Sequence, residues 1–254
     1  SALGGRPTLP ILGNLLLKVE ENVLSMTATD LEVELVSKVT LEGDFEAGSI
    51  TVPSRKFLDI CRGLPDDAII TFVLEGDRVQ VRSGRSRFSL ATLPANDFPN
   101  IEDWQSEVEV SLSQADLRTL IDKTQFSMAN QDVRYYLNGI LFVAEGKQLS
   151  LVATDGHRLS YAEGALSSTH DKREVILPRK AVLELSRQLG SSDAEVQVEI
   201  YASQVRLRYG SSELVTKIID GKFPDFNRVI PTNYQKTITL GRQDLLQSLQ
   251  RAAI

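Results

Sequence analysis

The chain has 254 residues, of which 42% are hydrophobic and 24% charged, and its formal net charge is −6. This length and balance favour about two globular domains and argue against an evenly basic nucleic-acid binder. The chain contains one cysteine and two histidines, which excludes an internal disulfide and leaves almost no ligands for zinc. No apolar run approaches the roughly 18 residues that cross a bilayer. We expect no cofactor, no metal, no membrane contact and a cytoplasmic location.

Alternating apolar residues predict short strands in the first 100 residues, interrupted by one helix. The helix is expected to begin at Pro53 and Ser54, which favour a helix start, and to end at Gly63. The strands are predicted at 15–19, 23–26, 31–36, 69–74, 78–82 and 86–92. A linker at 99–107 follows, and then a strand at 108–112 and a helix at 113–121 that is capped by Ser113.

The same pattern then recurs 125 positions later. Leu24–Asp30 matches Leu149–Asp155, Pro53 matches Pro178, and Phe98-Pro99 matches Phe223-Pro224. A constant offset over so long a stretch indicates a duplicated domain rather than a solenoid, whose repeats would be about 20–50 residues. The copies differ after the shared Thr-Asp, where the second copy has Gly156-His157-Arg158.

The strand and helix that open the second copy recur again near the end of the chain, with a strand expected at 237–240 and a helix from 241. We therefore expect a first domain at 1–105 without its opening elements, a second at 106–232, and the beginning of a third at 233–254. This implies a fragment of a longer protein. Each domain is expected to be α+β, with two helices on one side of antiparallel sheets.

Charge is concentrated on the helices predicted to start at Pro53 and Pro178. Each carries three basic residues and one acidic residue, although the whole chain is acidic. The basic residues are Arg55, Lys56, Arg62, Arg179, Lys180 and Arg187. One interpretation is two solvated amphipathic faces. The other is a surface that meets phosphate groups without reading sequence.

Several long motifs carry a resemblance to one family. They include Gly4–Leu12, Val81–Phe88, Gln131–Gly139, Ala153–Leu159 and Asp220–Asp225. Together they resemble the bacterial sliding clamp, the beta subunit of DNA polymerase III, over the whole chain. The resemblance implies three similar domains in each subunit and two subunits in a ring, with helices lining the hole and sheets outside. It implies a processivity subunit with no catalytic residues, which encircles duplex DNA and tethers the polymerase to it.

The resemblance also implies site residues. DNA contacts are expected from positions that match those of the family, namely the loop residues Arg6 and Gln131 together with Arg55, Tyr135 and Tyr136. Helix charge adds Arg62, Arg179, Lys180 and Arg187 to this set. Arginine suits phosphate, and tyrosine can stack on an exposed base. Strand packing remains the alternative interpretation of the two tyrosines.

The second implied site is a pocket for short apolar-aromatic peptides of the polymerase, the clamp loader and repair factors. Its expected residues are Leu137, Thr154, Gly156, His157, Arg158, Leu159, Pro224, Arg228 and Val229. Gly156 would let a ligand approach the backbone, and the aliphatic side chains would form an apolar floor. The alternative for His157 is a packed core histidine. The third implied site is the subunit boundary of a homodimer, formed by Arg85, Arg87, Phe88, Leu90 and Ile254. Phe88 and Leu90 are expected to give this boundary an apolar sheet edge.

Two other functions compete with the clamp hypothesis. The first is an enzyme, such as a hydrolase, that uses Asp155, His157 and Arg158; against it, the sequence has no Gly-x-Ser-x-Gly elbow, no Walker loop and no metal-ligand spacing. The second is a scaffold of repeated domains that binds only proteins.

Overall fold

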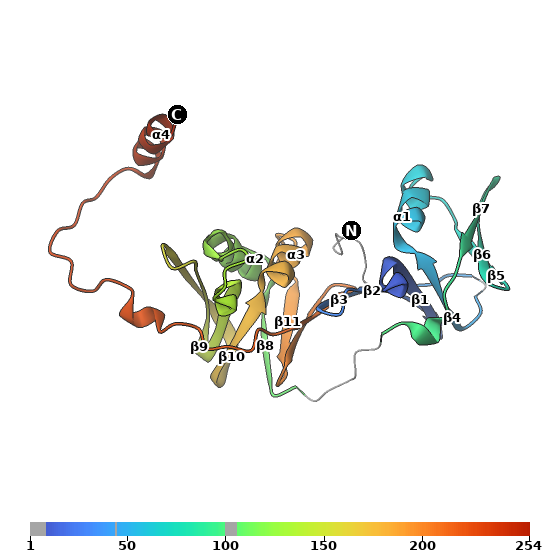
Figure 1. The fold of residues 1–254 in the computed structure, drawn as a ribbon, viewed down its shortest axis with the longest axis horizontal. Helices are drawn as coiled ribbons and strands as arrows, with labels where there is room; N and C mark the ends of the chain where they lie inside the picture. The colour runs from blue at the N-terminus through green and yellow to red at the C-terminus, as the bar shows by residue number, and fades with distance from the viewer. Residues whose placement is uncertain (1–8, 44, 100–105) are drawn as a thin grey trace. The chain divides into compact units, whose positions relative to one another are not determined.

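The computed structural model describes residues 9–43, 45–99 and 106–254. It divides into two units, residues 1–222 and residues 223–254, which are described separately below. Figure 1 shows the elements along the chain.

The first unit is built on one eight-stranded antiparallel sheet that contains strands from both copies of the repeat. Its order is β4 (Gly48–Pro53), β1 (Asn14–Glu20), β2 (Val23–Thr29), β3 (Val33–Thr40), β13 (Ser212–Lys217), β12 (Gln204–Tyr209), β11 (Glu195–Ile200) and β8 (Val108–Ser113). The copies meet where β3 pairs with β13, and Leu35 lies opposite Leu214 at this junction. The sheet is therefore continuous across the repeat.

One face of this sheet is apolar from edge to edge. Because side chains alternate along a strand and paired residues share a face, the strand registers place one apolar residue from each strand on the same side. In sheet order these are Val52, Leu17, Met26, Leu35, Leu214, Leu207, Val198 and Val110. A face of this kind must be covered.

Three helices cover the apolar face. Phe57 and Ile60 of α1 (Ser54–Gly63) pack with Leu17 and Val52. The helices α2 (Gln114–Thr124) and α3 (Arg179–Gln188) pack on the other half, in the core that contains Val110, Val198, Leu207 and Leu214. All three helices thus lie on the same side of the continuous sheet. The predicted helix starts at Pro53, Ser113 and Pro178 are confirmed, and the Ser113 hydroxyl accepts a hydrogen bond from the Asp116 amide at 3.0 Å.

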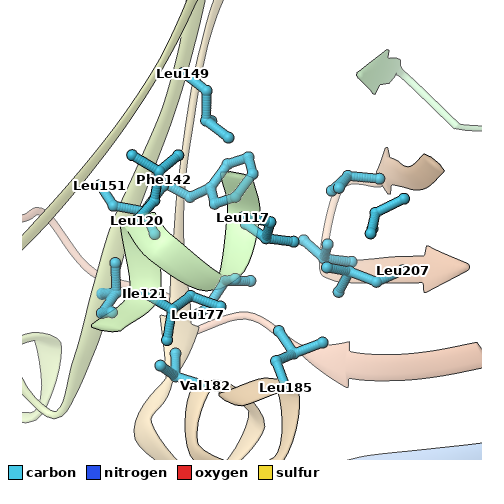
Figure 2. Close-up of a cluster of buried hydrophobic side chains, with 14 of the residues drawn as sticks. Leu117, Leu120, Ile121, Phe142, Leu149, Leu151, Leu177, Val182, Leu185 and Leu207 are labelled. Atoms are coloured by element: carbon cyan, nitrogen blue, oxygen red, sulfur yellow. The ribbon is translucent and has the colours of Figure 1, made fainter. Parts of the chain in front are cut away.

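Two smaller sheets complete the cores. Strands β5 (Thr71–Glu75), β6 (Arg78–Ser83) and β7 (Ser86–Ala91) add Val79, Val81 and Leu90 to the core under α1. The long strands β9 (Gly139–Thr154) and β10 (Leu159–Pro178) pair with each other and supply Phe142, Leu149, Leu151 and Leu177 to the core around α2 and α3 (Figure 2). The predicted α+β class, with helices on antiparallel sheets, is confirmed.

The second unit contains a short 3-10 helix, Phe226–Arg228, and α4 (Arg242–Ala252). The strand predicted at 237–240 does not form, so that prediction was wrong. A strand needs a neighbouring backbone for its hydrogen bonds, and none of the described residues pairs with this segment. The remaining 3-10 helices are Pro10–Gly13, Ala95–Asp97, Gln125–Ser127 and Tyr135–Leu137. No helix among the described residues is long and apolar enough to span a membrane.

The opposite face of the large sheet is charged near the junction of the two copies. On this face, Arg206 lies between Glu199, at 3.6 Å, and Glu213, at 3.5 Å. Glu34 of β3 is 8% exposed and lies beside this group. Burial is the main reason that the pKa of Glu34 is raised to about 7; Glu213 raises it further, and Arg206 opposes the shift.

We expect a Glu34→Gln variant to be more stable than the wild type at pH 8, by about 1–3 kcal/mol, with the difference vanishing below about pH 4. A raised carboxyl pKa means that the folded state binds the proton more tightly than the unfolded state does. The resulting stability is present at low pH and is lost as the pH rises through about 7. Urea unfolding at both pH values measures this, with exposed Glu32→Gln as the control; equal or lower stability of Glu34→Gln at pH 8 would refute the assignment.

Candidate nucleic-acid interface and partner pocket

Several basic residues of α1 and α3 are exposed on the helical side of the large sheet. Arg55 and Arg62 are exposed on α1. On α3, the Arg187 side chain is 69% exposed and approaches Glu184 at 3.4 Å. Because the two helices cover the same sheet face, these charges lie on the same side of the sheet. A polyanion approaching that side would meet both helices.

Two further residues of the predicted DNA set have partners within the protein. The Lys180 ammonium group forms an ion pair with Asp30, which lies in the turn between β2 and β3. Burial lowers the pKa of Lys180, and Glu184 opposes that shift. One Arg179 Nη atom donates to the Met128 carbonyl at 3.4 Å. Lys180 therefore connects the two copies of the repeat, and its charge is already partly compensated.

The loop at 131–136 carries the remaining predicted DNA contacts. Gln131 is exposed with a positive φ of 56°, and the Tyr135 side chain is 57% exposed. The Tyr135 and Tyr136 rings meet edge to face, with centroids 5.7 Å apart, and the Tyr135 ring and the Tyr136 Cβ atom lie against Gly221. The tyrosines are thus in a 3-10 helix rather than a strand. Arg6 lies outside the described residues.

The repeated Thr-Asp motif is a turn, and both copies build it identically. The Thr29 hydroxyl donates to the Val33 carbonyl at 3.1 Å, and Asp30 accepts from the Val33 amide at 2.9 Å. In the second copy the Thr154 hydroxyl donates to the Arg158 carbonyl at 2.7 Å, and Asp155 accepts from the Arg158 amide at 3.0 Å.

The amide of His157 also donates to Asp155, and the two backbone hydrogen bonds lower the pKa of this carboxylate. Its Oδ2 also accepts from the Arg158 side chain at 3.0 Å. A carboxylate committed to a turn in this way is a poor general base, which argues against the hydrolase hypothesis.

The copies differ in what lies against this turn. Leu31 and Gly156 occupy the same position with similar positive φ angles, 75° and 88°, so backbone conformation alone does not explain the glycine. A Cβ atom at Gly156 would lie 2.8 Å from an Arg134 guanidinium nitrogen. The group that approaches this glycine is therefore a side chain of the same chain. We did not single out Arg134 from the sequence, although its counterpart in the repeat, Leu9, differs from it in charge.

The pocket residues of the first unit differ in exposure. Leu137 is 2% exposed and belongs to the interior, Thr154 is buried by its turn, and Leu159 is half-buried. His157 and Arg158 are exposed, so His157 is not a core histidine. The Arg158 guanidinium lies 5.9 Å from the ring centroid of Phe126, an exposed aromatic residue that the sequence analysis also missed. In the second unit, Arg228 pairs with Asp225 at 3.0 Å and Val229 is 61% exposed; Pro224 belongs to the same unit.

The predicted subunit boundary lies on β7 and in the turn before it. Leu90 is 5% exposed and Phe88 packs on the same core, so both side chains point inward and do not form an apolar edge. That reasoning was wrong, because the register on β6 directs them to the core under α1. Arg85 and Arg87 are exposed, and β7 is an edge strand that pairs only with β6 among the described residues. Ile254 is fully exposed in the second unit.

Comparison with known families decides what this arrangement belongs to. The model of the DNA polymerase III beta subunit N-terminal domain matches residues 1–102, and that of the central domain matches residues 111–225. The chain belongs to the DNA polymerase III beta subunit family. It is a sliding clamp chain, and thus a non-catalytic processivity subunit in DNA replication.

Individual clamps agree with this assignment. The beta sliding clamp of Vibrio cholerae is 65% identical over 252 residues, which cover 99% of this chain and 69% of that protein. The clamp of Escherichia coli K12 is 55% identical over the same length and coverage. A crystal structure of the Pseudomonas aeruginosa clamp bound to griselimycin matches with a TM-score of 0.95 and 47% identity, covering 99% of this chain and 69% of that one.

Proposed function

We propose that this chain forms part of a homodimeric ring that encircles duplex DNA, with α1 and α3 facing the duplex. The observation that carries the proposal is the shared position of these helices on one apolar sheet face, with Arg55, Arg62 and Arg187 exposed. Such a surface binds phosphates through charge and counterion release, without reading base sequence. The acidic remainder of the chain discourages DNA from binding elsewhere. We place this function in the cytoplasm, where bacterial DNA is replicated.

The loop at 131–136 is assigned to contact at a junction with single-stranded DNA. The exposed Tyr135 ring offers a surface on which a base can stack, and Gln131 offers neutral hydrogen bonds. Arg6, Arg179 and Tyr136 are further proposed DNA contacts. Lys180 contributes less than its charge suggests, because Asp30 neutralises it.

We also propose the domain limits 1–105, 106–232 and 233–254, with β7 as the edge used between subunits.

Replacing Arg55, Arg62 and Arg187 with alanine should weaken duplex binding and make it less sensitive to salt. We would measure this in a chimaera in which the Vibrio cholerae clamp sequence continues after Ile254. Each lost phosphate contact should reduce the slope of log K against log salt by about 0.9, up to about 3 for all three. The matched control removes Lys18, Lys38 and Lys217, three exposed cations on the opposite sheet face. Equal slopes in the two triple variants would contradict the proposal.

We further propose that the turn at 154–159 is part of the pocket through which the polymerase catalytic subunit, the clamp loader and repair factors bind by short peptides. His157 and Arg158 supply exposed polar groups beside the half-buried Leu159. Thr154 holds this turn through its hydroxyl, and the buried Leu137 is assigned to the same pocket. The tether would raise the effective concentration of polymerase at the primer end.

Replacing His157 and Leu159 together with alanine should weaken peptide binding by about tenfold to a hundredfold, through lost contact area at the pocket. The probe is a fluorescein-labelled hexapeptide ending in leucine and phenylalanine, with griselimycin as competitor, because a related clamp binds that compound. Fluorescence anisotropy gives the Kd. Thermal unfolding should remain within a few degrees of the wild type, and a control with Tyr161→Phe should bind normally. An unchanged Kd in the double variant would mean that the peptide binds at another place on the protein.

A further inference from the structure

The loop at 131–138 and the turn at 154–158 are joined by one side chain, Arg134. Its Nε and Nη2 atoms donate to the two carboxylate oxygens of Asp132, at 3.0 and 2.8 Å. The same Nη2 atom donates to the Asp155 carbonyl at 3.2 Å. The guanidinium group also lies directly on the Cα of Gly156, where a Cβ would be only 2.8 Å from one of its nitrogens. Three residues from two separate segments thus meet at one planar cation.

The Asp132 end of this contact is itself fixed. The Asp132 backbone amide donates to the Asn138 side-chain oxygen at 3.0 Å, and the Asn138 side-chain nitrogen donates to the Asp132 backbone carbonyl at 2.9 Å. The Arg134 amide donates to Asp132 at 2.8 Å. The hydrogen bonds from Arg134 lower the pKa of the Asp132 carboxylate to about 2, so it is ionised at any physiological pH. The loop therefore holds Arg134 in one position.

The first copy of the repeat lacks this arginine, although the described part of its segment makes the same backbone hydrogen bond. The Leu12 amide donates to the Leu9 carbonyl at 3.1 Å, just as the Leu137 amide donates to the Arg134 carbonyl at 2.9 Å. Leu9 and Leu31 thus occupy the positions of Arg134 and Gly156, and both are largely exposed. The arginine and the glycine are a matched pair that only the second copy carries, and only there do we assign a peptide pocket.

We propose that Arg134 is a positioning residue that fastens the partner-peptide turn at 154–158 to the DNA-facing loop at 131–138, so that the two sites move as one body. The inference rests on the proposed function of both segments. A planar guanidinium suits this role because it forms two parallel hydrogen bonds to Asp132 while its Nη1–Nη2 edge lies against the glycine. A ligand bound at either site then changes the binding affinity of the other site, because both belong to one rigid element. The change in affinity is the same in both directions.

The ligand-free test is amide hydrogen exchange of the 254-residue chain. Arg134→Ala should speed exchange of the Gly156, His157 and Arg158 amides at least tenfold, while amides of β9 remain unchanged. The control is Arg118→Ala, which removes a half-exposed arginine that pairs with Asp122 and donates to the Leu189 carbonyl. Arg134→Lys should also exchange faster, since an ammonium group cannot form two parallel bonds and cover Gly156. Wild-type exchange at 156–158 in Arg134→Ala would overturn the proposal.

A double-mutant cycle then tests the contact between Arg134 and Gly156 with the labelled hexapeptide. Gly156→Ala should weaken binding at least fivefold more in the wild-type background than in Arg134→Ala. Strain from alanine at positive φ is present in both backgrounds and cancels in the cycle. Equal penalties in both backgrounds would overturn the proposal.

Coupling between the segments has its own readout. Hexapeptide binding should slow exchange of the Arg134 and Leu137 amides in the wild type, and this effect should be absent in Arg134→Ala. Slowing of the loop amides in both proteins would overturn the coupling. If the hexapeptide does not bind the wild-type protein, the pocket assignment is wrong. Hydrogen exchange without ligand still decides whether Arg134 fastens the turn.

Discussion

Replacing Leu214 with alanine is expected to lower the free energy of unfolding by about 2–5 kcal/mol, the usual cost of a cavity in a tightly packed core. Leu214 is 0% exposed. It lies on β13 between Leu207 of β12 and Leu35 of β3, where the two copies of the repeat share the sheet. The loss should therefore loosen the junction as well as the core around α2 and α3.

Urea unfolding measures this effect, and hydrogen exchange of the β3 amides shows whether the junction opens. The matched control is Val39→Ala, on the same sheet face of β3 but 48% exposed, which should cost less than about 0.5 kcal/mol. A Leu214→Ala variant within 1 kcal/mol of the wild type would mean that the continuous apolar face does not hold the copies together.

The duplication could be predicted from the sequence because matching residues recur at a constant offset of 125 positions. The helices after Pro53 and Pro178, and the cap at Ser113, depend on local signals that act within a few residues. The strand expected at 237–240 depends instead on a distant partner, so its local pattern was insufficient. Strand formation is decided by pairing as much as by propensity.

The candidate site was only partly predictable for the same reason. Lys180 looked like a DNA contact, yet its ion pair joins it to Asp30, 150 positions earlier in the chain. Phe88 and Leu90 were expected to form an apolar edge, yet their register points them into the core.

Gly156 was expected to admit a ligand, yet Arg134 covers it. In each case the side chain meets a partner that no local pattern specifies. The comparison of Leu9 with Arg134 was available in the repeat, and it was the one sequence signal that could have identified the arginine.

The second prediction with a large expected effect concerns retention on DNA. A closed ring stays on DNA because it surrounds the duplex, and tight binding is not required. A protein that only adheres to DNA leaves circular and linear molecules at the same rate. A ring can leave linear DNA by sliding off an end, whereas leaving circular DNA requires an interface to open. Weak phosphate contacts from α1 and α3 permit such sliding.

The most direct measurement is therefore retention of the chimaera on a nicked circular plasmid, before and after one restriction enzyme linearises it. The chimaera is first loaded onto the plasmid by the Vibrio cholerae clamp loader, and free protein is removed in a salt wash. We expect linearisation to shorten the half-life on DNA at least about tenfold, with or without the three arginines of α1 and α3. Equal half-lives on circular and linear plasmid would contradict the claim that these helices face an enclosed duplex.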